Sequence, residues 1–128
     1  MNADEREYLN HLAETVIGAA FEVSNVLGAG FLEKVYENAL LHELQLRGLK
    51  AEAQKPIGVT YKGKSVGDYV PDVLVDDHLI VELKCVDALL PEHLAQCLNY
   101  LKATGLRLAL LLNFQRPKVE VKRVVLGF

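Results

Sequence analysis

One stretch, Tyr69–Lys84, constrains the fold more than any other part of the sequence. It contains two runs rich in β-branched and aliphatic residues, separated by a short polar turn, and this pattern predicts a β-hairpin. Side chains on a strand alternate between its two faces. In the second run, Leu79–Lys84, the side chains of Glu82 and Lys84 therefore point to one face, while their apolar neighbours point into a core.

The length of the turn decides where Asp72 points. A three-residue turn over residues 76–78 places Val75 opposite Leu79 and Asp72 opposite Glu82. Directly opposed residues share a face, with Cβ atoms roughly 4.5–5.5 Å apart. Two carboxylates at that separation repel each other unless a cation lies between them. A two-residue turn would send Asp72 to the other face, so chemistry at this position requires the longer turn.

Length and charge set the broad class of the protein. The chain has 128 residues, of which 51% are hydrophobic, and a net charge of −3. We expect one domain over residues 1–128, because this length and composition suffice for one core. The charge is uneven: residues 1–45 carry eight acidic and two basic residues, whereas residues 102–128 carry one acidic and six basic residues.

The basic C-terminal segment has two interpretations. Lys118, Lys122 and Arg123 could bind the phosphates of a nucleic acid that approaches from one side. They could equally be the solvated face of an edge strand. The sequence alone leaves both open.

The two cysteines, Cys85 and Cys97, form neither a disulfide framework nor a zinc-binding pattern, and their apolar neighbours predict buried thiols. Neither a signal peptide nor an apolar run long enough to span a membrane is present. We therefore expect a soluble, cytoplasmic protein that makes no membrane contact.

The first part of the chain predicts two helices. Apolar residues recur at steps of three and four over residues 3–26, and Gly28 is expected to end this helix. A second helix is expected from about Phe31 to Arg47. Its expected core stripe consists of Leu32, Val35, Ala39, Leu40 and Leu44. Glu33 falls on another side, in the first turn, where the helix dipole favours any carboxylate.

The middle of the chain predicts strands, because its apolar residues alternate. Residues 52–61 and 64–75 are expected to be two strands joined by a turn at residues 62–63. The first contains Pro and Gly, which indicate an edge strand or a bulge. Together with Leu79–Lys84 they are expected to form a three-stranded antiparallel meander.

The last part of the chain predicts a crossover. Pro91 is expected to start a helix that ends at about Thr104. This helix joins Leu79–Lys84 to a buried strand over residues 106–113, so the two strands should be parallel and the connection right-handed. A half-exposed strand over residues 119–126 follows. The pattern predicts an α/β fold in which a mixed sheet has helices on both faces.

Six polar side chains are candidates for chemistry, and five of them lie in the hairpin and the following helix. They are Glu33, Asp72, Glu82, Lys84, Gln96 and Tyr100. Each has a structural alternative: a first-turn acid, a turn residue after proline, an exposed ion pair of little energetic value, or the polar rim of a packed helix. Their combination in one hairpin and one helix favours a functional site.

At these residues the sequence resembles a known superfamily. Pro71-Asp72 followed by Glu82-Leu83-Lys84 resembles the PD-(D/E)xK signature of the restriction-endonuclease-like nucleases. Gln96-x-x-x-Tyr100 resembles an additional motif of the RecB and lambda-exonuclease-like branch. Gly30-Phe-Leu-Glu33-Lys-Val-Tyr36 is similar to the signature of the bacterial GxxExxY proteins. The resemblance covers about residues 5–126 and implies the restriction-endonuclease-like αββ βαβ core, here with an extra N-terminal helix.

The resemblance also implies roles for these residues. Asp72, Glu82 and the backbone carbonyl of Leu83 would hold Mg²⁺ or Mn²⁺, because a hard cation prefers oxygen ligands. Glu33 would be a third acidic ligand or lie just outside the ligands. Lys84 would orient the attacking water or stabilise negative charge at phosphorus.

The function implied is that of a metal-dependent nuclease acting on DNA or RNA. Gln96 and Tyr100 would orient Lys84 or contact the nucleic-acid backbone, and since no base-reading element is evident, sequence specificity is not expected. The alternative is a non-catalytic nucleic-acid-binding or protein-interaction module on the same fold, with a homodimer or a partner protein as further options. The intact set of two acids and a lysine favours the enzyme.

Overall fold

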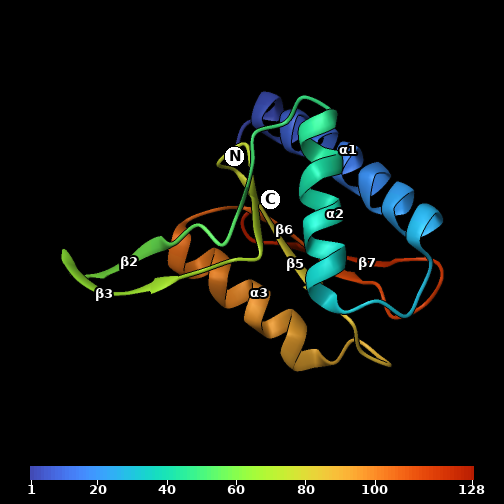
Figure 1. Ribbon diagram of the computed structural model, residues 1–128. Helices are drawn as coiled ribbons and strands as arrows, with labels where there is room; N and C mark the ends of the chain where they lie inside the picture. The colour runs from blue at the N-terminus through green and yellow to red at the C-terminus, as the bar shows by residue number, and fades with distance from the viewer.

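A five-stranded mixed sheet forms the centre of the computed structural model, which describes residues 1–128 (Figure 1). Helices α1 (Ala3–Leu27) and α2 (Glu33–Leu46) cover one face, and α3 (Pro91–Thr104) covers the other. None of these helices combines the length and the apolar character that a membrane crossing requires. The predicted α/β class, with helices on both faces and an additional N-terminal helix, is confirmed.

The order of strands in the central sheet confirms the predicted crossover. From edge to edge the strands are β1 (Ala51–Ala53), β4 (Val73–Val75), β5 (Leu79–Lys84), β6 (Leu108–Asn113) and β7 (Glu120–Val125). β5 and β6, which α3 connects, are parallel, and the other neighbouring pairs are antiparallel. Apolar side chains of β5 alternate between the two cores, so that Leu79, Val81 and Leu83 face α1 and α2 while Ile80 faces α3.

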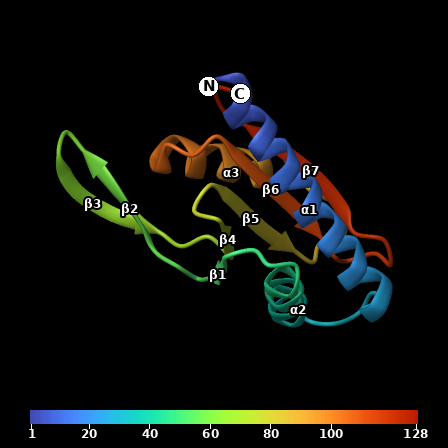
Figure 2. The ribbon, with the colours of Figure 1, turned by 90° about the horizontal axis from the view of Figure 1, so that it is seen from above.

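The expected three-stranded meander is wrong in one respect, because both long strands are broken. β2 (Ile57–Tyr61) and β3 (Lys64–Tyr69) pair only with each other, and this β2–β3 arm projects from the side of the molecule (Figure 2). The first strand breaks where Gln54 adopts a φ of 55° and Pro56 lacks an N–H to donate. The second breaks before Pro71. Of the four pieces into which these two strands divide, only β1 and β4 therefore join the central sheet.

The two N-terminal helices begin and end close to the predicted residues, but α2 is rotated about its axis relative to the prediction. Leu32, expected in the core, precedes the helix and is 80% exposed, and Val35 is also exposed. Tyr36 is fully buried instead: its ring stacks on Phe114 at a centroid distance of 4.8 Å, and its hydroxyl donates a 2.6 Å hydrogen bond to the Gly28 carbonyl. This anchor turns the Tyr36 side of α2 toward the sheet.

Candidate active site

The β4–β5 hairpin has the register that brings Asp72 and Glu82 together. Val75 lies opposite Leu79, and residues 76–78 form the three-residue turn that the chemistry requires. Asp76 and Asp77 adopt φ values of 51° and 60°, which aspartate tolerates better than most residues. The predicted register is therefore confirmed.

Asp72 and Glu82 hold each other through the backbone. The Asp72 N–H donates to Oε1 of Glu82 at 3.1 Å, and Oδ2 of Asp72 accepts from the Leu83 N–H at 2.8 Å. The other oxygen of each carboxylate accepts no hydrogen bond from an N–H group, and the two carboxyl groups lie close enough to share a hydrogen bond when Glu82 is protonated. The N–H and C=O of a strand residue point to the same edge, so the Leu83 carbonyl faces the edge on which Asp72 lies.

The electrostatics of this pair are those of a site that favours a cation. Glu82 is only 5% exposed. Burial, and then the negative charge of Asp72, raise the pKa of Glu82 from 4.5 to about 8, against the opposing effects of the Asp72 N–H and the Lys84 charge. Glu82 therefore binds a proton at neutral pH unless another positive charge offsets the repulsion. Two convergent carboxylates, each with one free oxygen, fit a hard divalent cation.

Lys84 and Glu33 lie beside this pair. Lys84 is half-buried on the face of β5 that carries Glu82. Glu33, in the first turn of α2, has a pKa raised by partial burial and then by the charge of Asp72, while the charge of Lys84 lowers it. Glu33 is therefore near enough to sense both. However, no group of three or more His, Cys, Asp or Glu side chains is arranged to hold a metal ion, which favours a position for Glu33 outside the ligands.

Helix α3 adds a tyrosine and a glutamine. Nε2 of Gln96 donates to the Tyr100 hydroxyl at 2.9 Å. Burial, followed by the charges of Glu82 and Asp72, raises the pKa of Tyr100 to about 12, which places its hydroxyl within range of the carboxylates. The ring of Tyr69, at the end of β3, packs edge-on against Tyr100 at 4.5 Å. The hydrogen bond of Gln96 is thus to Tyr100 and not to Lys84.

Asn113 supports the site and was missed in the sequence. It is buried at the end of β6, paired with Lys84 on β5. Its side-chain amide accepts a hydrogen bond from the Val86 N–H at 3.1 Å and donates one to the Val86 carbonyl at 2.9 Å. These bonds hold the backbone directly after Lys84. A polar amide at the end of an otherwise apolar run was the only available signal.

The three basic residues of the C-terminal segment do not form one surface. Lys118 lies over the ring of Phe21 at 5.7 Å, and Arg123 donates a hydrogen bond to Asn10, so both lie on the α1 side of the sheet. Lys122 is opposite Leu111, whose side chain packs beneath α3, so Lys122 shares the face of the candidate site. Of the three, only Lys122 therefore lies on the face of the sheet that carries Glu82.

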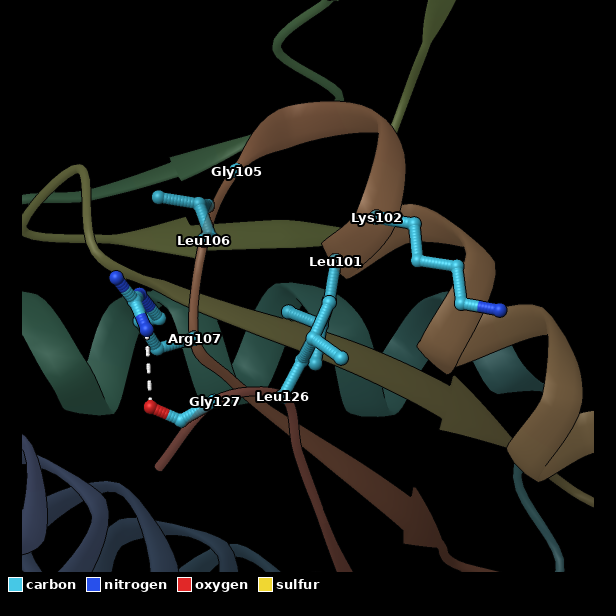
Figure 3. A pocket seen from close by; sticks show the side chains of 7 residues that line it. All are labelled: Leu101, Lys102, Gly105, Leu106, Arg107, Leu126 and Gly127. Carbon is cyan, nitrogen blue, oxygen red and sulfur yellow. Dashed lines mark hydrogen bonds between the residues drawn. The ribbon is translucent and has the colours of Figure 1, made fainter. Parts of the chain in front are cut away.

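A separate hollow of about 320 Å³ lies between the end of α3, the start of β6 and the end of β7 (Figure 3). Leu101 and Leu126 both line it, whereas Lys102 and Arg107 point in different directions. Arg107 already donates a 2.9 Å hydrogen bond to the Gly127 carbonyl. Since no acidic or nucleophilic side chain lines this hollow, it offers no chemistry of its own.

One family model and two solved structures are similar to this chain. Residues 10–124 match the model of a family described as the PD-(D/E)XK nuclease superfamily. No curated protein matches the chain closely enough to serve as a relative. Among solved structures, an alkaline exonuclease (LHK-Exo) from Laribacter hongkongensis is 17% identical with a TM-score of 0.46, covering 83% of this chain and 75% of its own. LHK-Exo in complex with dAMP is 15% identical with a TM-score of 0.47, covering 88% and 82%.

Proposed function

Because the chain belongs to the PD-(D/E)XK nuclease superfamily, we propose that it is a metal-dependent nuclease that hydrolyses phosphodiester bonds of DNA or RNA without sequence specificity. The observation that carries this proposal is the reciprocal hydrogen bonding of Asp72 and the Glu82-Leu83 segment, with Lys84 on the same face. A binding protein gains nothing from directing two carboxylates at a phosphate. A hydrolase needs such a pair to hold a cation.

The residues of the pair fit Mg²⁺ or Mn²⁺. The free oxygens of Asp72 and Glu82, with the carbonyl of Leu83, would hold the ion. Bound there, it would supply positive charge that stabilises the negative charge developing on the phosphoryl oxygens. Mg²⁺ is usually bound by one or two carboxylates plus substrate phosphates, so the site does not need Glu33 as a third acid.

Lys84 supplies the second positive charge of the site. Its ammonium group, on the same face as Glu82, would stabilise the charge on the phosphoryl group or orient the attacking water. Glu33, outside the ligands, would hold Lys84 in place by charge attraction. This arrangement assigns Lys84 to the reacting phosphate and Glu33 to positioning.

Gln96 and Tyr100 form the α3 side of the site. Gln96 orients the Tyr100 hydroxyl through their 2.9 Å hydrogen bond, and we assign this pair to contact with the nucleic-acid backbone. Because no base-reading element is evident in the sequence, we propose cleavage without sequence specificity. Three points stay predictions: whether the substrate is DNA or RNA, whether the chain forms a homodimer or binds a partner protein, and whether it is cytoplasmic.

A cleavage assay tests the proposal. Labelled single- and double-stranded DNA and RNA would be incubated with the pure protein in Mg²⁺, Mn²⁺ or EDTA. We expect cleavage with either metal, none in EDTA, loss in Lys84→Ala, and retention in Lys102→Ala, which removes an exposed lysine from the last turn of α3. Equal cleavage by Lys84→Ala would point to a contaminant. Binding without cleavage under every condition would favour the non-catalytic module.

A further inference from the structure

The base of the β2–β3 arm contacts Tyr100, a residue of the candidate site. Ile57 packs on the core beneath α3, and Tyr69 packs on Tyr100. Tyr100 in turn lies within range of the charges of Asp72 and Glu82. The arm therefore starts beside the carboxylates and extends away from them (Figure 2).

The register of the arm determines which side chains share a face with its base. Ile57 is opposite Tyr69, and Tyr61 is opposite Lys64. Because strand side chains alternate, Ile57, Val59 and Tyr61 point to one face, and Lys64 shares it as the partner of Tyr61. The register leaves Val66 on β3 without a partner, and this bulge places Lys64 opposite Tyr61, on the same face as Ile57. One face thus runs from the tyrosine pair at the site to Tyr61 and Lys64 at the tip.

The tip of the arm is aromatic and positively charged. Tyr61 is 63% exposed, and the ammonium group of Lys62 lies 5.4 Å from the centre of its ring. Neither Lys62 nor Lys64 forms an ion pair, whereas Lys55, at the base, pairs with Glu52 and Asp77. The only acid on the two strands, Asp68, is opposite Gly58 and points to the other face.

We propose that this face of the arm binds a single strand of the nucleic acid that passes through the site, with Tyr61 stacking on a base and Lys64 neutralising a phosphate. Exposed aromatic rings beside unpaired cations are how proteins hold single strands without reading their sequence. From Ile57 to Tyr61 the strand advances about 13 Å at roughly 3.3 Å per residue. This corresponds to about four stacked nucleotides at roughly 3.4 Å each. The inference rests on the proposed nuclease function and adds a substrate length to it.

The test compares two lengths of labelled oligothymidylate by fluorescence anisotropy in EDTA. Tyr61→Ala combined with Lys64→Gln should weaken binding of a 20-nucleotide strand on the order of tenfold or more. The salt dependence of log K should also become shallower by about 0.7, as expected for one lost phosphate contact on a single strand. Binding of a 2-nucleotide strand, which at roughly 3.4 Å per nucleotide is too short to reach from the site to the tip, should not change. Arg6→Gln on α1 is the charge-matched control, and Thr60→Ala, on the opposite face of the arm, is the local control.

Two further variants separate the arm from the catalytic site and from folding. Tyr61→Phe keeps the ring and should bind like the natural protein, which distinguishes stacking from a structural role of the hydroxyl. Lys84→Ala should lose cleavage but keep its preference for the longer strand, so a failure of the nuclease proposal is distinguishable from a failure of the arm. Unchanged 20-nucleotide binding in the double variant would overturn the inference, as would equal losses for both lengths. A dimer in sedimentation that the double variant dissociates would instead assign the face to a second copy of the chain.

Discussion

The backbone N–H of Asp72 donates a hydrogen bond to Oε1 of Glu82 at 3.1 Å, and the Asp72 carboxylate accepts one from the neighbouring Leu83 at 2.8 Å. Each acid thus has one oxygen fixed by a backbone N–H and a second oxygen that no N–H contacts. Burial of Glu82 and the charge of Asp72 make the ionised pair costly. The hairpin therefore favours a positive charge beside the two acids. Several measurable properties depend on this preference.

The stability of the metal-free protein should fall as pH rises through the pKa of Glu82. Its pKa is about 8 when folded and near 4.5 otherwise, so the folded state binds this proton more tightly. The contribution of this proton to the free energy of unfolding is fully present below pH 4.5. It is lost progressively as pH rises to 8. Glu82→Gln should remove it, changing the slope by up to about 1.4 kcal/mol per pH unit. Urea unfolding in EDTA between pH 5 and 8 measures the free energy of unfolding of the natural protein and of Glu82→Gln.

The control for this experiment is Glu92→Gln, which removes an exposed acid from the first turn of α3. Its stability should follow the natural protein across the pH range. Parallel curves for Glu82→Gln and the natural protein would show that Glu82 ionises normally, and the account of the site's electrostatics would then be wrong.

Mg²⁺ should raise the midpoint of thermal unfolding. A ligand that binds only the folded state stabilises it by about 1.4 kcal/mol at a tenfold excess over its Kd, which corresponds to roughly 5 °C for a domain of this size. The gain should be larger at pH 8 than at pH 6, since metal binding must displace the proton of Glu82. Asp72→Asn should abolish the shift, while Asp68→Asn on the arm should retain it. An equal shift in the two variants would exclude Asp72 as a ligand.

Replacing Lys84 should reduce the rate of cleavage more than replacing Gln96. Lys84→Ala should lose turnover while binding substrate and metal, because its charge acts on the developing negative charge. Lys84→Arg should restore little, since a planar guanidinium cannot replace a compact ammonium group. Gln96→Ala should cost about tenfold, or about 1.4 kcal/mol in the barrier. Single-turnover rates on one substrate measure all three, and equal losses for Gln96→Ala and Lys84→Ala would refute this division of roles.

Tyr36→Phe should destabilise the fold by about 1–3 kcal/mol. The Tyr36 hydroxyl donates to the Gly28 carbonyl and accepts from the Phe31 N–H, and these bonds fix the loop between α1 and α2. Urea unfolding would measure the loss. Tyr61→Phe, which changes an exposed hydroxyl, should alter stability by less than about 0.5 kcal/mol. If both substitutions had the same small effect, Tyr36 would not anchor the loop through its hydroxyl.

Local patterns in the sequence were sufficient for the centre of the site. Alternation along β5 places Glu82 and Lys84 on one face, and the length of the polar turn places Asp72 opposite Glu82. Both depend only on residues within the hairpin. Likewise, Pro91 and Gly105 bound α3, and a helix between two buried strands requires them to be parallel. Where neighbours along the chain decide the geometry, the prediction held.

Tertiary contacts decided the remainder. The rotation of α2 depends on Tyr36 stacking on Phe114, a partner far along the chain that helical periodicity cannot reveal. The separation of Lys118 and Arg123 from Lys122 depends on which face of β7 meets α1.

The β2–β3 arm shows the same division. The sequence marks the weak points at Pro56 and Pro71, since proline cannot donate to a ladder. Whether the strands then continue across the sheet or pair with each other is a competition between alternative long-range contacts. The packing of Ile57 beneath α3 and of Tyr69 on Tyr100 settles it. The sequence by itself thus determined the acids and the lysine, whereas only the tertiary structure placed an exposed arm beside them.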